Sequence, residues 1–233
     1  MPKYYTVNLN TVRNVSASLS NEQRIAEATG SVKLLLVPRG ADQLISEGMI
    51  PDYLVTDDMV TRFLEISPPF AAVIPEFQEV IIEIEKAYVR GEFFSAVSAA
   101  CVSIERLLNL ARIELRKYHQ FKKALWNKGP LDNWAGSIEP LQHWGYLDKG
   151  FAEELADMYK SVRCKYLHSG DLSTMPDDAR RSVHAAYKLL KIFLGFPEEL
   201  FDFTTGINCK DENDPRFKAF YLPNIHEGTS GAT

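Results

Sequence analysis

The chain has 233 residues, of which 45% are hydrophobic and 24% are charged, and its formal net charge at pH 7 is −5. This length can bury a large core, and the ordinary share of apolar residues excludes global disorder. A net negative charge is atypical of a protein that binds nucleic acid without sequence preference.

The cysteines and histidines indicate the redox compartment and whether a metal site is to be expected. The three cysteines form no C-x-x-C pair, and none of the five histidines has another histidine four residues away. We therefore expect a reducing, cytoplasmic setting and no metal or other cofactor. No uninterrupted apolar run approaches the length that spans a bilayer, and the first residues do not form a signal peptide, so we expect no membrane association.

Residues 1–68 predict a small segment of mixed α and β structure. Residues 4–9 alternate weakly between apolar and polar side chains, which favours a short strand. Ser20 is a good N-cap for a short helix, and Gly30 is expected to end that helix at residue 29. The apolar run 31–37 fits a buried strand or a helix segment, and its periodicity does not separate the two.

A second helix of this segment is predicted to begin after Thr56, where two acidic residues follow the cap, and to run to about Ile66. The sequence Ser67-Pro68-Pro69 then breaks the chain, because each proline drives the preceding residue out of helical geometry. We place a domain boundary there. This boundary separates an N-terminal segment, residues 1–68, from a helical domain, residues 69–196. A C-terminal tail, residues 197–233, follows the helical domain.

The middle part is predicted to be helical almost throughout. Apolar residues recur with a period near 3.6 over four stretches, 75–89, 92–118, about 148–168 and 176–194. The second stretch carries the seam of an antiparallel bundle at Val97, Cys101, Ile104, Leu108, Ala111 and Leu115.

The fold class is therefore mainly α, an antiparallel helical bundle with a small α+β N-terminal segment and a mostly irregular tail. The three tryptophans, Trp126, Trp134 and Trp144, are expected to pack rather than to stack on bases. Aromatic residues of the tail are expected to dock on the body, and residues 227–233 are expected to be disordered.

The stretch 161–171 closes the third long helix and places three cations around its last turn, Arg163, Lys165 and His168. The helix is predicted from apolar residues at spacings of four, three, four and four: Phe151, Leu155, Met158, Val162 and Tyr166. Gly170 is expected to follow its end, where the helix dipole favours a proton on the histidine. Arg163 and His168 are five positions apart, so they diverge by about 140° on an ideal helix. They converge only if the last turn unwinds or if two copies of the helix meet across a two-fold axis.

This stretch resembles the R-x4–6-H motif of the HEPN superfamily, small helical domains that are often metal-independent ribonucleases. The run 91–108 is similar to the opening hairpin of a HEPN-like family often found beside restriction and defence genes, and the resemblance covers residues 75–195. One departure is Cys164, because active families commonly carry Asn, Asp or His after the arginine. A second pair with suitable spacing, Arg112 and His119, lacks the context of a long helix followed by a short polar loop and another long helix.

The resemblance implies a HEPN-like bundle and a metal-independent endoribonuclease that acts in prokaryotic defence or in toxin-like RNA cleavage. In this role His168 moves a proton near neutral pH, and Arg163 stabilises charge on the phosphate. Glu105 is expected to orient Arg163, as an acidic residue on this helix does in the family. Lys165 and Ser169 could contact phosphate. The expected partners are single-stranded RNA, a second copy of the chain in a homodimer, and a protein that restrains or triggers activity.

Other interpretations stay open. Arg163 could pair with Glu105 or Asp157 in a purely structural role, with His168 capping its helix. A catalytically silent HEPN-like module that binds nucleotide, RNA or a protein of a defence complex fits the acidic composition and the cysteine after the arginine. A third interpretation is an adaptor built around residues 1–68.

Charge is unevenly distributed along the chain. Residues 42–92 include eleven acidic and three basic side chains, whereas residues 105–128 include seven basic and two acidic ones. These stretches are either two solvated helix faces of opposite sign or a basic strip for phosphates that an acidic segment restrains or covers.

Overall fold

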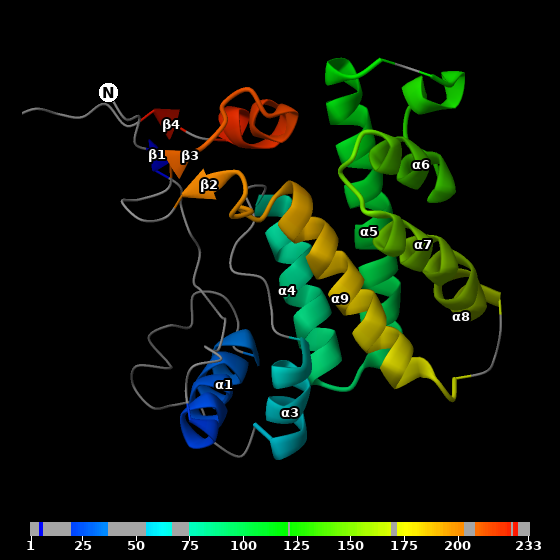
Figure 1. The fold of residues 1–233 in the computed structure, drawn as a ribbon. Helices are drawn as coiled ribbons and strands as arrows, with labels where there is room; N and C mark the ends of the chain where they lie inside the picture. Colours follow the sequence, from blue (N-terminus) through cyan, green and yellow to red (C-terminus); the bar gives the residue numbers. More distant parts are fainter. Residues whose placement is uncertain are drawn as a thin grey trace, which may run out of the picture.

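The computed structural model describes residues 5–6, 20–36, 55–66, 75–120, 122–168, 172–202, 208–224 and 226–227. Helices dominate these residues, so the predicted mainly α fold is confirmed (Figure 1). The α-helices are α1 (Asn21–Leu36), α3 (Asp57–Ile66), α4 (Pro75–Val89), α5 (Phe93–Leu115), α6 (Ala135–His143), α7 (Lys149–Met158), α8 (Cys164–His168) and α9 (Met175–Phe193). Shorter turns are the 3-10 helices η2 (Arg116–Tyr118) and η3 (Ala124–Asn127) and the π-helical turn η4 (Tyr159–Arg163).

The longest helix, α5, lies at the centre of the bundle, with α4 and α9 packed along it and α6 and η4 against another side (Figure 1). Each of the six residues of its predicted seam is at most 4% exposed. The α4–α5 hairpin turns at Gly91, whose φ of 79° suits a residue without a Cβ. The Gly91 N–H donates to the Tyr88 carbonyl and the Glu92 N–H to the Ala87 carbonyl, each at 2.9 Å, which ends α4.

The first helix, α1, continues through Gly30, where the sequence predicts its end. Ala28, Val32 and Leu35 are all 0% exposed, so one buried face extends across the glycine. This packing outweighs the roughly 1 kcal/mol that a glycine costs inside a helix. The run 31–37, which fits a strand or a helix by sequence, is helical up to Leu36.

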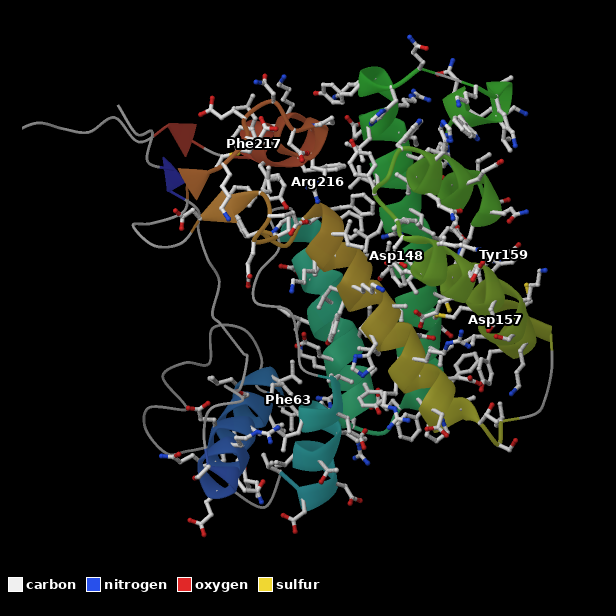
Figure 2. The ribbon with its side chains drawn as sticks, in the orientation of Figure 1. Phe63, Asp148, Asp157, Tyr159, Arg216 and Phe217 are labelled. Atoms are coloured by element: carbon white, nitrogen blue, oxygen red, sulfur yellow. The ribbon has the colours of Figure 1, made fainter. Side chains whose placement is uncertain are left out.

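Helix α3 connects the first segment to the bundle. It packs against α1, α4 and α9, and its Phe63 is buried (Figure 2). The Tyr88 hydroxyl of α4 donates to Oε2 of Glu65 on α3 at 2.7 Å. The buried core is continuous through all three predicted parts of the chain. Residues 67–74 lie outside the described residues, so the domain boundary stays a prediction.

The tail packs on the C-terminal end of α9 through aromatic side chains. Phe201, Phe217, Phe220 and Tyr221 are at most 1% exposed. Arg216, next to Phe217 (Figure 2), pairs with carboxylates of Glu199 and Asp214, each at 3.0 Å. Regular structure here is short: η5 (Phe217–Tyr221) and η6 (Leu222–Asn224).

Two short antiparallel strand pairs complete the fold: β1 (Tyr5–Thr6) with β4 (His226–Glu227), and β2 (Phe201–Asp202) with β3 (Asn208–Cys209). In the first pair Tyr5 lies opposite Glu227, and in the second Phe201 lies opposite Cys209. The predicted strand near the N-terminus thus pairs with the end of the tail. Residues 228–233, expected to be disordered, lie outside the described residues.

Among the described residues, one helical stretch, Phe93–Tyr118, is long and apolar enough to cross a membrane by length and composition. This stretch contains Glu105, Arg106 and Arg112 and so is not an uninterrupted apolar run, and the expectation of no membrane association stays a prediction. Half of its apolar window is buried inside the protein, where α4 and α9 pack on it. The core helix of a globular bundle has the same properties, so this stretch does not by itself indicate a membrane protein.

Candidate functional site

The motif helix is continuous from α7 through η4 to α8 but contains one wider turn. The Cys164 N–H donates to the Tyr159 carbonyl, five residues back, instead of four. The spacings from Met158 to Val162 and from Val162 to Tyr166 would rotate about 80° beyond two full turns on an ideal α-helix. The π-turn absorbs this excess, and all three residues stay at most 8% exposed. Turns of this kind are frequent at functional sites.

Arg163 ends the π-turn and is held by an acid and an aromatic ring. Its Nη2 lies 2.8 Å from Oε2 of Glu105 on α5, and the two side chains are 23% and 26% exposed. Its guanidinium carbon lies 5.2 Å from the centre of the Tyr159 ring, which itself packs against buried Trp134. Figure 2 shows Tyr159 at the end of the α7 ribbon. The guanidinium is thus fixed in direction yet partly open to solvent, which suits recognition of a phosphate.

The pair with Glu105 is common to the catalytic and the structural interpretation of Arg163. The other acid considered, Asp157, has its Oδ2 3.0 Å from Nη1 of Arg181 on α9, and this oxygen accepts from Ser161 Oγ at 3.2 Å. The structure therefore brings Glu105, and not Asp157, to the arginine.

His168 is the last residue of α8, and its side chain lies outside the described part of the protein, as does all of Ser169. The backbone from Cys164 to His168 is α-helical. The divergence of about 140° between Arg163 and His168 on an ideal helix is therefore not removed by unwinding of the last turn. The other route to convergence, the pairing of two copies, stays a prediction.

Lys165 contacts α9. Its Nζ donates to Oγ1 of Thr174 at 2.6 Å and lies 3.7 Å from Oδ2 of Asp178. The Tyr166 hydroxyl donates to the same carboxylate oxygen at 2.6 Å. Sequence reasoning names neither Asp178 nor Tyr159 as part of this region. Tyr159 lies four residues before the arginine, which is a visible pattern, but the contact with Asp178 depends on how the next helix folds back.

Cys101, near Arg163, is not an activated thiol. Cys101 lies one helical turn before Glu105 on α5, and burial raises the pKa of its thiol to about 12. It is therefore protonated at neutral pH. Cys164 is half-buried and forms no disulfide.

The second arginine of suitable spacing, Arg112, is a structural residue. It is 0% exposed, and its guanidinium donates to Oγ of Ser137 at 3.0 Å and to Oδ1 of Asn109 at 3.2 Å. It also donates to the carbonyls of Trp126, Lys128 and Gly129. Burial lowers the pKa of this guanidinium, and the positive charge of Arg116 adds to the effect. Arg112 thus fixes the loop after η3 and cannot reach a phosphate.

His119, its partner by spacing, belongs to an aromatic cluster. Its ring stacks on Trp144 at 4.9 Å between centroids with an interplanar angle of 9°, and Nε2 lies 2.9 Å from the Tyr146 hydroxyl. Trp126 and Trp134 are buried and Trp144 is half-buried, in the packing role expected of them.

The basic stretch 105–128, which one of the two interpretations makes a strip for phosphates, is only partly available to a phosphate. Arg112 is buried, and Arg116 donates to the Asn127 carbonyl at 2.7 Å. Lys117 and Lys123 form ion pairs with Glu114 and Glu139.

Comparisons of the chain with protein-family models, with curated protein sequences and with solved structures find no match. Among the described residues, no group of three His, Cys, Asp or Glu side chains is arranged to hold a metal ion. The fold and the site together define a class of protein. It is mainly helical, and a partly exposed arginine at the π-turn near the end of a long helix forms an ion pair with a glutamate.

Proposed function

We propose that this protein is a metal-independent endoribonuclease of the HEPN type, with Arg163 and His168 as its catalytic pair. The observation that supports it best is the Arg163–Glu105 ion pair, which is 2.8 Å long, about one quarter exposed, and placed at the end of the π-turn. The resemblance to the HEPN superfamily implies that an acidic residue on α5 holds the arginine. His168 follows at the C-terminal end of the same helix, where the helix dipole favours its cationic form.

The reaction would be an internal transesterification of single-stranded RNA. The ribose 2′-oxygen forms a bond to the adjacent phosphorus and gives its proton to a neutral His168, while the bond from phosphorus to the 5′-oxygen breaks and that oxygen takes up a proton. Arg163 stabilises the negative charge that grows on the phosphate oxygens. The products are a 2′,3′-cyclic phosphate and a 5′-hydroxyl. Proton transfer of this kind accelerates a reaction by about 10²–10⁴-fold.

A homodimer would complete this centre. The divergence of about 140° within one helix is poor geometry for two groups that share one phosphate. Two-fold pairing of the α8 ends would place two arginines and two histidines around one cleft, so that one histidine accepts the 2′ proton and the other protonates the leaving oxygen. In this proposal the enzyme acts in the cytoplasm in defence or toxin-like RNA cleavage, and a partner protein restrains it.

Incubation of the purified protein with single-stranded RNA tests the proposal. Wild type should give 2′,3′-cyclic phosphate ends in the presence of EDTA, and His168→Ala should lower the rate at least about 10²-fold with a nearly unchanged melting temperature. His184 is an exposed histidine on α9, so His184→Ala is the matched control and should cleave normally. The proposal fails if wild type leaves RNA intact both alone and with its natural partner.

A binding module without catalysis is the second candidate. It is favoured by Lys165, which contacts Thr174 and Asp178 and so offers less charge to a phosphate, and by Cys164 after the arginine. In that case wild type and His168→Ala bind labelled single-stranded RNA with equal affinity, and neither cleaves it.

A further inference from the structure

A polar cluster connects the last turn of the motif helix to the start of α9. One oxygen, Oδ2 of Asp178, accepts hydrogen bonds from the hydroxyls of Tyr166 and Thr174, each at 2.6 Å. Lys165 Nζ donates to Thr174 Oγ1 at 2.6 Å and lies 3.7 Å from the same carboxylate oxygen. Tyr166 is 8% exposed and the Asp178 side chain 19%. The bond from Tyr166 is short, has a carboxylate as its acceptor and is partly shielded from water, which are the properties of a strong hydrogen bond, whereas Thr174 is exposed.

We propose that Tyr166 and Asp178 are positioning residues that set the direction of the turn carrying His168. Tyr166 lies two positions before His168 in α8, so both side chains move together when this helix rotates about its axis. Because the Tyr166 hydroxyl is bonded to another helix, such a rotation stretches its bond to Asp178. The inference rests on the proposed ribonuclease function where it concerns catalysis, and on the hydrogen bonds alone where it concerns the position of the turn.

The α8 part of the motif helix needs such an anchor because it ends that helix and follows an irregular turn. It has five residues and begins where the π-turn η4 ends. The π-turn gives this last part of the motif helix a different phase from α7. Contacts with neighbouring helices therefore decide its orientation.

The two halves of the proposed centre are held by two acids on two different helices. Glu105 of α5 holds Arg163 at 2.8 Å, and Asp178 of α9 holds Tyr166 at 2.6 Å. Helices α5 and α9 pack against each other through the core. The relative position of the arginine and the histidine turn thus follows from the packing of α5 on α9.

Tyr166→Phe tests this inference because it removes only the hydroxyl. Tyr88→Phe is the matched control: Tyr88 is 2% exposed, and its hydroxyl donates to the Glu65 carboxylate at 2.7 Å, between α4 and α3. Both substitutions should lower the melting temperature by similar amounts, because each removes one hydrogen bond from a tyrosine to a carboxylate. Tyr166→Phe alone should lower kcat for RNA cleavage by about 10- to 100-fold, with KM changed by less than about twofold, because a small misplacement of a catalytic group slows the chemical step.

A readout that needs no catalysis separates this inference from the ribonuclease proposal. The five histidine side chains are isotope-labelled and observed by NMR in the whole protein. The resonance that disappears in His168→Ala belongs to His168, and its position reports the surroundings of the His168 imidazole. Tyr166→Phe and Asp178→Asn should shift the His168 resonance, and Tyr88→Phe should not. If wild type cleaves no RNA but this resonance still shifts, the ribonuclease proposal fails and the positioning of the turn stands. If Tyr166→Phe matches Tyr88→Phe in kcat and leaves the His168 resonance unchanged, the positioning role is overturned.

Discussion

Two arginines of this chain precede a histidine at a similar spacing, and they lie in very different surroundings. Arg112 is 0% exposed and is bonded to a hydroxyl, an amide oxygen and backbone carbonyls. Arg163 is 23% exposed and pairs with the carboxylate of Glu105. The first holds a loop in place, and the second stays within reach of a ligand.

Motif spacing therefore does not distinguish a structural arginine from one that can meet a substrate. A guanidinium has five N–H donors, and Arg112 uses its Nε, Nη1 and Nη2 atoms within the protein. An arginine whose donors are committed in this way has no capacity left for a phosphate. Burial and the chemistry of the partner are what separate the two, and both can be tested by the same substitution.

The largest effect is expected on catalysis. Arg163→Lys keeps the charge but loses the planar fork, so RNA cleavage should fall by about 10²-fold. Arg112→Lys, assayed at a temperature at which it is folded, should cleave within about threefold of wild type because this position does not face the substrate. Initial rates at saturating RNA measure both. Equal losses of activity in the two folded variants would contradict the assignment of Arg163 to the catalytic centre.

The same two variants should reverse their order in stability. Arg112→Lys should lower the free energy of unfolding by about 3 kcal/mol or more, because an ammonium cannot satisfy the acceptors that surround this buried site. Arg163→Lys should change it by less than about 1 kcal/mol, as for other partly exposed ion pairs. Urea-induced unfolding followed by circular dichroism gives both values. A small effect at Arg112 would mean that the loop after η3 has other support.

The oligomeric state also separates the two arginines, since only the Arg163 region is proposed to need a second copy. Sedimentation at micromolar concentration should give about twice the mass of one chain. Mixing Arg163→Ala with His168→Ala protein should restore partial cleavage, because a mixed dimer keeps one intact arginine and one intact histidine from different chains. A monomer with full activity would exclude the composite centre.

The long helices could be predicted because an apolar face recurs over several turns, as in the seam of α5, which is buried along its length. The end of α1 could not be predicted from the sequence. Gly30 is a good local stop signal, but Val32 and Leu35 beyond it find a buried place against α3 and α4, and this tertiary contact decides the outcome. The π-turn does have a sequence pattern. Two successive apolar spacings of four before Tyr166 favour a turn wider than that of an α-helix.

The contacts of the site were less accessible from sequence. Glu105 could be named as a partner of Arg163 because it flanks the seam of α5 and has a counterpart in the resemblance. The partners of Arg112 lie 14 to 25 positions further along the chain, apart from the nearby Asn109. No local pattern indicates which carbonyls will face an arginine, because that depends on how the chain closes.

The smallest expected effect concerns the histidine that accompanies Arg112. Burial, and to a lesser degree the positive charge of His143, lower the pKa of His119 from its ordinary value of 6.5. The unfolded chain therefore binds a proton at this residue at a higher pH than the folded protein does. The contribution of His119 to the free energy of unfolding is fully present above pH 6.5 and is lost as the pH falls from 6.5 through the lower folded pKa.

His119→Phe tests this sign, because phenylalanine keeps an aromatic ring against Trp144 but cannot take up a proton. The free energy of unfolding, measured in urea between about pH 7.5 and pH 5.5, should decline less steeply in the variant than in wild type. Part of the decline should remain, because partial desolvation of the imidazole, with the nearby charge of Arg180, also lowers the pKa of His184. The pH dependence of RNA cleavage should be the same in the variant and in wild type, since His168 is the proposed proton carrier. Identical stability slopes in the two proteins would show that His119 titrates alike in the folded and unfolded states, and a shifted pH–rate profile would connect the structural pair to the catalytic one.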